Sequence, residues 1–337
     1  MKVLENHSLK LHNTFGVDVK ARYFIELESL SDYDTIIKDK ELSGMAKYIL
    51  GSGSNVLFIK DYHGVIIKNC IKGIDILEED EDSVIIKFGG GENWDETVKH
   101  CVKNGYAGLE NLSLIPGTVG AAPVQNIGAY GAEIKDVFVS LNGIFIEKGI
   151  RKSFTKDECN FGYRSSIFKN TFMNKFFVSD VTMKLSKKGE VNLSYKALKD
   201  YCDGRGVTKP TIANIRKFVV AIRQSKLPDP EVVGNAGSFF KNPFVDEDKY
   251  ESLAAQYKSL IVYKSDEGYK IPAGWLIEQC GLKGYRESNV GIYPKQALVI
   301  VNYGDAGGDE IISFSKMVQT EVMNKFGILL EPEVNII

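Results

Sequence analysis

The segment from Gly234 to Pro243 constrains the fold of this chain more than any other stretch. It reads Gly-Asn-Ala-Gly-Ser-Phe-Phe-Lys-Asn-Pro, so small residues surround a single hydroxyl, that of Ser238. Small residues around one polar side chain are typical of a place where a ligand approaches the main chain, and the two phenylalanines can anchor such a loop in a core. The same residues are typical of a tight turn with a capping serine, and the segment alone does not separate the two interpretations.

Two further glycine-rich segments have the composition of phosphate-binding loops. Residues 50–57 place glycines and serines between two short β-type runs, and residues 115–131 combine glycine and proline turn points with almost no charge. Such loops let main-chain N–H groups converge on an anion. Neither matches the P-loop pattern or a Gly-x-Gly-x-x-Gly between a strand and a helix, and the first could be a hairpin turn. Two such loops in one chain favour a dinucleotide pyrophosphate without naming the ligand.

Composition narrows the class of protein. The 337 residues suffice for two or three domains, and 42 basic against 44 acidic residues give a net charge of −2, so we expect neither nucleic acid nor a membrane surface as a partner. The five cysteines are scattered without a Cys-x-x-Cys or His/Cys cluster, which argues against disulfides and a metal site. No signal peptide and no run of about 20 apolar residues is present, and we expect a cytoplasmic location.

Strands and helices are mixed without regular βαβ alternation, which predicts an α+β fold. Asp95 is expected to cap a helix that stops at Gly105, and the acidic stretch from Glu78 to Asp82 is expected to be a solvated turn. The Pro-rich segment at 227–230 indicates a domain boundary. Periodicity and end signals predict further helices at about 211–224, 246–257, 272–280 and 308–326, and a terminal strand at 328–337.

Six motifs, in the right order, are similar to those of a known family. The chain resembles the bacterial UDP-N-acetylenolpyruvoylglucosamine reductases, flavoenzymes of peptidoglycan precursor synthesis, from Asn13 nearly to its C-terminus. The motifs are Gly51–Leu57, Ile115–Gly131, Tyr163–Phe168, Gly234–Pro243, Ala273–Gln279 and Glu331–Val334.

The resemblance implies the FAD-binding fold of the vanillyl-alcohol-oxidase/PCMH type with a separate α+β substrate-binding domain. We expect an FAD-binding region over residues 1–227, with subdomains at about 1–70 and 71–210. The substrate-binding domain would cover 228–320, and residues 321–337 would return to the FAD-binding region as a C-terminal strand. We also expect a monomer whose partner is a small nucleotide-sugar substrate.

The resemblance also implies a reaction in two halves. NADPH reduces a non-covalently bound FAD, and UDP-N-acetylglucosamine enolpyruvate then enters the same site and is reduced to the lactyl ether. Ser238 corresponds to the proton donor, Arg164 to the arginine that pairs with the substrate carboxylate, and Glu333 to the carboxylate that stabilises the enol-like intermediate. Negative charge builds on the substrate carboxylate in such a reduction, so donors should be aimed there.

Without the family, these residues have plainer interpretations. Arg164 could be a surface arginine after a β-turn, and Glu333 could be a solvated charge on an edge strand. Glu331 and Glu333 lie two residues apart on one face of a strand, so periodicity does not choose between them. The family motif favours Glu333.

Further residues are assigned roles through the motifs. Tyr195 matches a tyrosine loop that closes over the substrate diphosphate in one class of these reductases, and Arg223 could equally be a solvated helix charge. Gln296 is a weaker candidate because Tyr293 stands where family members carry histidine, and Lys283 is weaker still. The cofactor-binding residues are Gly51, Ser52, Gly53, Ser54, Asn55, Pro116, Gly117, Gly120, Asn126, Gly128 and Ala129; the substrate-binding residues are Tyr130, Tyr195, Arg223, Lys226, Asn242 and Gln296.

Two other functions stay open from the sequence. Another flavin oxidase or dehydrogenase of the same fold would keep the glycine loops but not the interpretation of Ser238 and Tyr195. A binding protein without turnover would have no need of Arg164, Ser238 and Glu333 together.

Overall fold

The computed structural model describes residues 2–265 and 268–337, and its contacts divide the chain into two compact units. The first unit comprises Met1–His7, Ala21–Ser52 and His63–Ser225, and the second comprises Ser8–Lys20, Gly53–Tyr62 and Lys226–Ile337. The last stretch of the second unit begins two residues before Pro228, where the sequence indicates a boundary. The division into regions 1–227, 228–320 and 321–337 stays a prediction.

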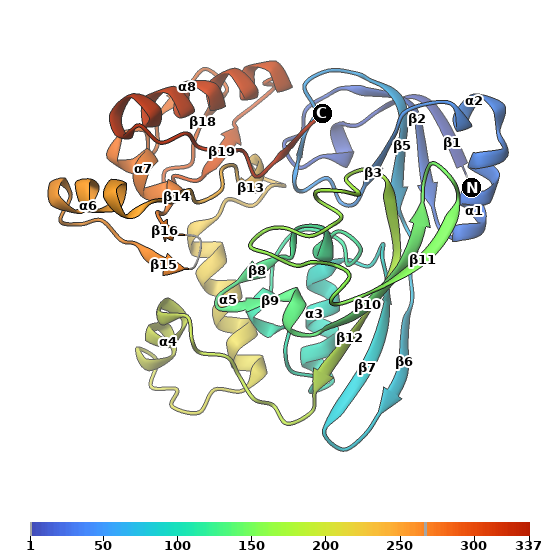
Figure 1. The fold of residues 1–337 in the computed structure, drawn as a ribbon, viewed down its shortest axis with the longest axis horizontal. Coiled ribbons are helices and arrows are strands. Elements are labelled where there is room, and N and C mark those ends of the chain that lie inside the picture. Colours follow the sequence, from blue (N-terminus) through green and yellow to red (C-terminus); the bar gives the residue numbers. More distant parts are fainter. Residues whose placement is uncertain (1, 266–267) are drawn as a thin grey trace. The chain divides into compact units, whose positions relative to one another are not determined.

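The first unit contains a five-stranded sheet whose neighbouring strands all run antiparallel (Figure 1). Helix α3 (Trp94–Lys103) packs Trp94, Val98 and Cys101 against this sheet in one apolar core. The strands occur in the order β11 (Ile150–Thr155), β10 (Phe138–Phe145), β12 (Phe176–Ser186), β7 (Ser83–Gly89) and β6 (Ile74–Glu79).

A four-stranded sheet shares the first unit. Its order is β1 (Lys2–Ser8), β2 (Lys20–Leu27), β5 (Tyr62–Asn69) and β3 (Lys47–Leu50), with β3 and β5 parallel. Helix α1 (Leu30–Lys38) begins at a capping box of Ser29 and Asp32, and α2 (Lys40–Ser43) follows it. The side chains of Tyr33 and Ile36 pack into a second core, which includes Val65 of β5 and Phe177 of β12.

The remaining elements of the first unit include two helices, whose small core Tyr130 packs against, and short elements in and near the glycine-rich segment at 115–131. Helices α4 (Lys196–Asp203) and α5 (Ile212–Lys226) form a small core in which Leu198 and Cys202 pack against Ile215 and Val219. The short elements are η2 (Glu110–Leu112), η3 (Ala122–Gln125), β8 (Gly128–Ala129), β9 (Ala132–Glu133) and η4 (Ile134–Asp136).

The second unit is built on an antiparallel sheet with helices beside it, coloured mostly orange and red in Figure 1. Helix α8 (Gly308–Phe326) contacts α7 (Ala273–Gln279), β18 and β19. The strand order is β13 (Gly234–Ser238), β19 (Val299–Asn302), β18 (Val290–Ile292) and β17 (Arg286–Glu287).

Smaller elements complete the second unit. A three-stranded sheet has the order β14 (Phe244–Val245), β16 (Gly268–Lys270) and β15 (Tyr263–Ser265), and α6 (Glu247–Gln256) contacts β16. The C-terminal β20 (Asn335–Ile336) runs parallel to β4 (Val56–Leu57), and η1 (Lys10–His12) lies near the start of the chain.

The α+β prediction is confirmed, because most strand pairs are antiparallel and no regular βαβ alternation occurs in the described residues. The helix predicted at 308–326 has those bounds, and the other predicted helices lie within a few residues of their expected ends. Residues 78–82 are exposed, as a solvated segment should be, although Glu78 and Glu79 still belong to β6.

Two expectations about element ends are wrong. The side chain that caps α3 is Asn93, which accepts a hydrogen bond from the Glu96 N–H at 3.0 Å. Asp95 lies inside the first turn, and its carboxylate accepts hydrogen bonds from Arg216 instead of capping the helix. The terminal strand covers Asn335–Ile336 rather than 328–337, because residues before it pair singly with the segment after Ser238.

Candidate active site

Arg164 is held against the glycine-rich segment of the first unit. It occupies the left-handed region with φ +51°, in a turn closed by the Gly162–Ser165 bridge. Its Nη2 donates to the Gly128 carbonyl at 2.6 Å, and a Cβ at Gly128 would lie 2.9 Å from Arg164 Nη1. A side chain at position 128 would therefore displace the guanidinium. The structure thus brings the predicted residues Arg164, Gly128 and Ala129 together.

Asn126 joins the same two segments through its side chain. Its Nδ2 donates to the Gly162 carbonyl at 3.0 Å and to Glu133 Oε2 at 2.9 Å, and its Oδ1 accepts from the Lys135 N–H. The residue is fully buried. Its side chain braces the turn that carries Arg164, so this structure offers no surface of Asn126 to a cofactor.

A buried hydroxyl lies beside the first glycine of the 51–55 loop. Thr118 Oγ1 is one of two buried side-chain polar atoms in the described residues that have no hydrogen-bond partner, and a Cβ at Gly51 would lie 2.8 Å from it. An orphaned buried hydroxyl costs free energy unless a partner arrives. The pair therefore forms a narrow cradle for a polar ligand atom.

Other predicted cofactor residues line the same part of the first unit. Pro116 is exposed and Gly117 is half-buried with φ +147°, while Ser52 is exposed. Gly120 is buried, and a Cβ there would lie 3.0 Å from the Gly90 carbonyl oxygen. Gly120 thus allows the loop to pack closely against Gly90. Pro116 and Gly117 of this loop are accessible.

In the second unit, Gly53 brings the loop at 53–55 onto the chain at 12–14. Its φ is +71°, and a Cβ would lie 2.0 Å from the His12 carbonyl oxygen, so no other residue fits. The Thr14 N–H donates to the Gly53 carbonyl at 3.1 Å. Half-buried Ser54 and Asn55 follow.

Ser238 and Glu333 are brought to neighbouring segments of the second unit. Ser238 ends β13, and the next residue, Phe239, accepts a hydrogen bond from the Glu333 N–H at 2.8 Å. Asn55 Nδ2 donates to the Glu333 carbonyl at 3.4 Å. Glycine at position 237, with φ +70°, lies at the register shift of β13 just before the serine. Both candidate catalytic side chains are half-buried.

Glu331 is placed differently from Glu333. Its carboxylate forms an ion pair with Lys241 Nζ at 3.0 Å, and its side chain is 69% exposed. Exposed pairs of this kind contribute little and interact mainly with solvent. The structure therefore separates two glutamates that periodicity could not, and the half-buried Glu333 is the better candidate.

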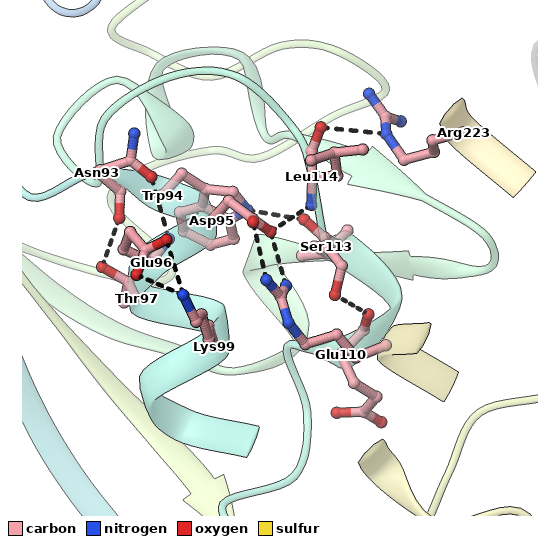
Figure 2. A network of polar contacts seen from close by, with 12 residues as sticks. Asn93, Trp94, Asp95, Glu96, Thr97, Lys99, Glu110, Ser113, Leu114 and Arg223 are labelled. Atoms are coloured by element: carbon pink, nitrogen blue, oxygen red, sulfur yellow. Dashed lines mark hydrogen bonds and ion pairs between the residues drawn. The ribbon is translucent and has the colours of Figure 1, made fainter. Parts of the chain in front are cut away.

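A charged network supports the start of the glycine-rich segment (Figure 2). Asp95 of α3 accepts two hydrogen bonds from Arg216 of α5, at 2.6 and 2.8 Å, and one from the Leu114 N–H at 2.5 Å. Leu114 has φ +57°, and its carbonyl accepts from Arg223 Nε at 3.2 Å. Burial alone raises the pKa of Asp95, but these hydrogen bonds and the Arg216 charge outweigh it and hold that pKa below its ordinary value.

Arg223, a member of this network, interacts with the first of two neighbouring tyrosines, Tyr130 and Tyr195. Burial lowers the pKa of Arg223 and raises that of Tyr130, and the two side chains interact with each other. The ring of Tyr130 meets that of Tyr195 edge to face, with centroids 5.4 Å apart. Tyr195 is 42% exposed at the start of α4. Three predicted substrate residues thus form one cluster in the first unit.

The other predicted substrate residues belong to the second unit. Lys226 is exposed at the end of α5. Asn242 Oδ1 accepts from the Ala273 N–H at 2.9 Å, and a Cβ at Gly274 would lie 3.3 Å from Gln296 Oε1. Asn242 and Gln296 therefore both lie against the first turn of α7. Neither of these two contacts involves Tyr293 or Lys283.

The predicted residues divide between the two units, each of which is described by itself. The first unit carries Arg164, Gly51, Ser52, Pro116, Gly117, Gly120, Asn126, Gly128, Ala129, Tyr130, Tyr195 and Arg223, and the second carries Gly53, Ser54, Asn55, Lys226, Ser238, Asn242, Gln296 and Glu333.

The sequence interpretation missed three supporting residues. Thr118 lies inside the glycine-rich segment at 115–131. Its hydroxyl could have been predicted as a ligand contact on the same grounds as the serines of the 50–57 loop. Asp95 and Arg216 are far apart in sequence, and no local sequence pattern predicts that they form an ion pair. Within the described ranges, no helix is long and apolar enough to cross a membrane, and no group of three or more His, Cys, Asp or Glu residues could hold a metal ion.

Relatives that match this chain over nearly its full length include members of one reductase family. Residues 229–337 match the family model "UDP-N-acetylenolpyruvoylglucosamine reductase, C-terminal domain", and residues 21–150 match "FAD binding domain". A UDP-N-acetylenolpyruvoylglucosamine reductase of Flavobacterium johnsoniae is 47% identical over 339 residues, covering 100% of both chains. That of Chromobacterium violaceum is 43% identical over 327 residues, covering 96% of each.

A solved structure is similar in fold. The UDP-N-acetylenolpyruvylglucosamine reductase of Thermus caldophilus superimposes with a TM-score of 0.67 and 22% identity, covering 99% of this chain and 98% of that one. At this identity the similarity shows the fold alone.

Proposed function

The chain belongs to the UDP-N-acetylenolpyruvoylglucosamine reductase family, and from this premise we propose how its residues carry out the reaction. It is an FAD-dependent oxidoreductase of peptidoglycan precursor synthesis, with the FAD-binding fold of the vanillyl-alcohol-oxidase/PCMH type. It reduces the enolpyruvyl group of UDP-N-acetylglucosamine enolpyruvate and forms UDP-N-acetylmuramate, with NADPH as the reductant. Identity to the reductases along the full length of the chain carries this conclusion.

The residues present fit FAD. The buried Thr118 hydroxyl has no hydrogen-bond partner and lies beside Gly51, so it could donate to a phosphate oxygen of the cofactor. When bound, FAD supplies the hydride chemistry, and the protein supplies binding and orientation. The proposed contacts are Gly51, Ser52, Gly53, Ser54, Asn55, Pro116, Gly117, Gly120 and Ala129, with Thr118 added; Gly128 and Asn126 act by placing Arg164.

We propose that Ser238 donates the proton to the substrate carbon and that Glu333 stabilises the negative charge formed before that transfer. A serine is a weak acid, so it needs a neighbour that stabilises the developing charge. The Glu333 N–H bond to Phe239, one residue after Ser238, supports this pairing. Glu333 is half-buried beside the segment that carries Ser238, whereas Glu331 is exposed and paired with Lys241, which favours Glu333 for this role.

Arg164 is proposed to pair with the substrate carboxylate. The Gly128 carbonyl takes one guanidinium nitrogen, Nη2, and fixes the plane of the group. A guanidinium fixed in this way suits bidentate binding of a carboxylate, which a lysine at the same position could not reproduce. Left-handed backbone at Arg164 supports a functional role, since such strain is retained where the surrounding structure over-determines it.

Tyr130, Tyr195 and Arg223 are proposed to bind the nucleotide part of the substrate, with Lys226, Asn242 and Gln296 as further polar contacts. The chain carries a net charge of only −2, so a diphosphate must be met by local donors. Burial lowers the pKa of Arg223, and its interactions with Tyr130 and Asp95 oppose that effect. We also propose that the protein acts as a monomer in the cytoplasm, which light scattering on the purified protein and cell fractionation test.

The roles of Ser238 and Glu333 are tested by measuring the two half-reactions separately. In Ser238→Ala, flavin reduction by NADPH should stay near the wild-type rate, while reoxidation by substrate should slow by about 10²- to 10⁴-fold. Glu333→Gln should slow reoxidation far more than Glu331→Gln, which is the matched control. Equal loss of both half-reactions in Ser238→Ala, or a larger effect of Glu331→Gln, contradicts the assignment.

A further inference from the structure

Asn111 lies behind the tyrosine pair and contacts both segments that carry it. It belongs to η2 and is 1% exposed. One amide nitrogen, Nδ2, donates to the Tyr130 carbonyl at 2.8 Å and to the Asn192 carbonyl at 3.0 Å. Both amide hydrogens are therefore used, one for each segment. The two acceptors also fix the orientation of the amide, because its oxygen in that place would face two carbonyls.

A second set of contacts fastens the same segments together. Asn192 Nδ2 donates to the Gly131 carbonyl at 2.9 Å, and Asn192 Oδ1 accepts from the Ser194 N–H at 2.9 Å. Gly131 has φ +84°, and a Cβ there would lie 2.4 Å from Ser194 Oγ. Residues 192–194 thus lie directly on Gly131. These contacts hold the base of the loop, while the ring of Tyr195 beyond it stays 42% exposed.

The geometry points to Asn111 as a positioning residue that anchors the Tyr195 loop to Tyr130 and so prepares both rings for the nucleotide of the substrate. This inference rests on the proposed roles of Tyr130 and Tyr195. A loop already fixed at its base loses less conformational freedom when it orders on a ligand. Removing the anchor should therefore weaken substrate binding and leave the hydride chemistry at the flavin unchanged.

The burial of Asn111 shows that its side chain has a free-energy cost as well as a gain. Its Oδ1 is the second buried polar atom without a hydrogen-bond partner in the part of the chain that the structure describes. An asparagine whose carbonyl oxygen is unsatisfied is a poor choice for stability alone, since an apolar residue would avoid the desolvation cost. The two hydrogen bonds from its nitrogen are the compensating gain, and both serve the loop.

The test uses the flavin-loaded enzyme and three alanine variants. Asn111→Ala loses two neutral hydrogen bonds and should raise the substrate Kd by about 10- to 30-fold. Its rate of flavin reduction by NADPH should match the wild type. Hydrogen exchange in the peptide covering 187–196 should become faster by a similar factor. Asn104→Ala is the matched control, because Asn104 is exposed at the C-terminal end of α3 and its Nδ2 donates to the His100 carbonyl at 2.8 Å, away from the Tyr195 loop.

Asn192→Ala keeps the test decisive if Asn111→Ala does not fold. Asn192 is exposed, so its replacement leaves the core intact, and it removes the bonds to Gly131 and Ser194. The same pattern of weaker substrate binding, faster loop exchange and unchanged flavin reduction supports the inference. Substrate binding and loop exchange at wild-type values in the folded variants overturn it, as does a parallel loss of flavin reduction. Failure of the wild type to bind substrate would instead contradict the proposed function.

Discussion

Replacing Asp95 (Figure 2) by asparagine removes the negative charge that forms an ion pair with Arg216. The asparagine has nearly the shape of aspartate and keeps one acceptor oxygen. Its amide nitrogen, however, would face the guanidinium in either orientation, and in one of them it would also face the Leu114 N–H; both groups are donors. Arg216 would then lie largely buried without its counter-charge.

The expected loss follows from burial. The side chains of Arg216 and Asp95 are 15% and 21% exposed. Removing one partner of a fully buried pair costs about 3–5 kcal/mol, and partial access of water together with the remaining acceptor reduces this to about 2–3 kcal/mol. Glu96 provides a control in the same helical turn. Its pair with Lys99 is 67% and 60% exposed, so Glu96→Gln should cost less than about 0.5 kcal/mol.

Unfolding of the first unit can be followed through Trp94. The chain contains two tryptophans, and Trp94 is 1% exposed next to Asp95. In a Trp275→Phe background, tryptophan fluorescence reports on Trp94 alone. Urea denaturation at pH 7 of this background, with and without Asp95→Asn or Glu96→Gln, gives the two differences in the free energy of unfolding.

The dependence on pH has a definite sign. The folded pKa of Asp95 lies below its ordinary value of 3.8, so the contribution of the charge is fully present above that value and is lost as pH falls through the folded pKa. The free-energy difference between the parent and Asp95→Asn should therefore shrink below about pH 4. A difference at pH 7 no larger than that of Glu96→Gln, or one that does not change at acid pH, would refute this account of the network.

Three further predictions concern the site. Gly51→Ala places a Cβ 2.8 Å from Thr118 Oγ1 and should weaken FAD binding by about tenfold, which fluorescence titration of the apoprotein measures; an unchanged FAD affinity would contradict a cofactor contact at this position. Arg164→Lys keeps the charge but loses the fork, and stopped-flow reoxidation by substrate should slow by about 10²-fold while NADPH reduction persists; equal rates would exclude bidentate binding. Tyr195→Phe should raise the substrate Kd by about tenfold in calorimetry with unchanged flavin content, and an unchanged Kd would remove the hydroxyl from the binding site.

Local signals predicted some elements closely. Helix α8 has the predicted bounds because Asp309 and Glu310 occupy its first turn and Gly327 ends it in the left-handed region. The start of α3 was harder, since Asn93 and Asp95 are both favourable caps two residues apart. The distinction depends on Arg216, which sequence neighbours cannot indicate.

Non-local pairing explains what sequence reasoning left open in the site. Periodicity placed Glu331 and Glu333 on the same face, and only contacts with the distant segment after Ser238 separate them. The terminal strand was overestimated for the same reason, because residues before Asn335 bond singly to that segment. Asn126 matched a cofactor position by motif, yet its side-chain nitrogen donates to the Gly162 carbonyl and to the Glu133 carboxylate.

An anaerobic titration tests the central claim most directly. The purified protein is reduced with NADPH, UDP-N-acetylglucosamine enolpyruvate is added, and the visible flavin absorbance is followed. The account predicts that the band bleaches with NADPH and returns on addition of substrate, with one lactyl ether formed for each flavin reoxidised. A flavin that bleaches but stays reduced in the presence of this substrate would contradict the assigned reaction, and a protein that binds no flavin would contradict the cofactor as well.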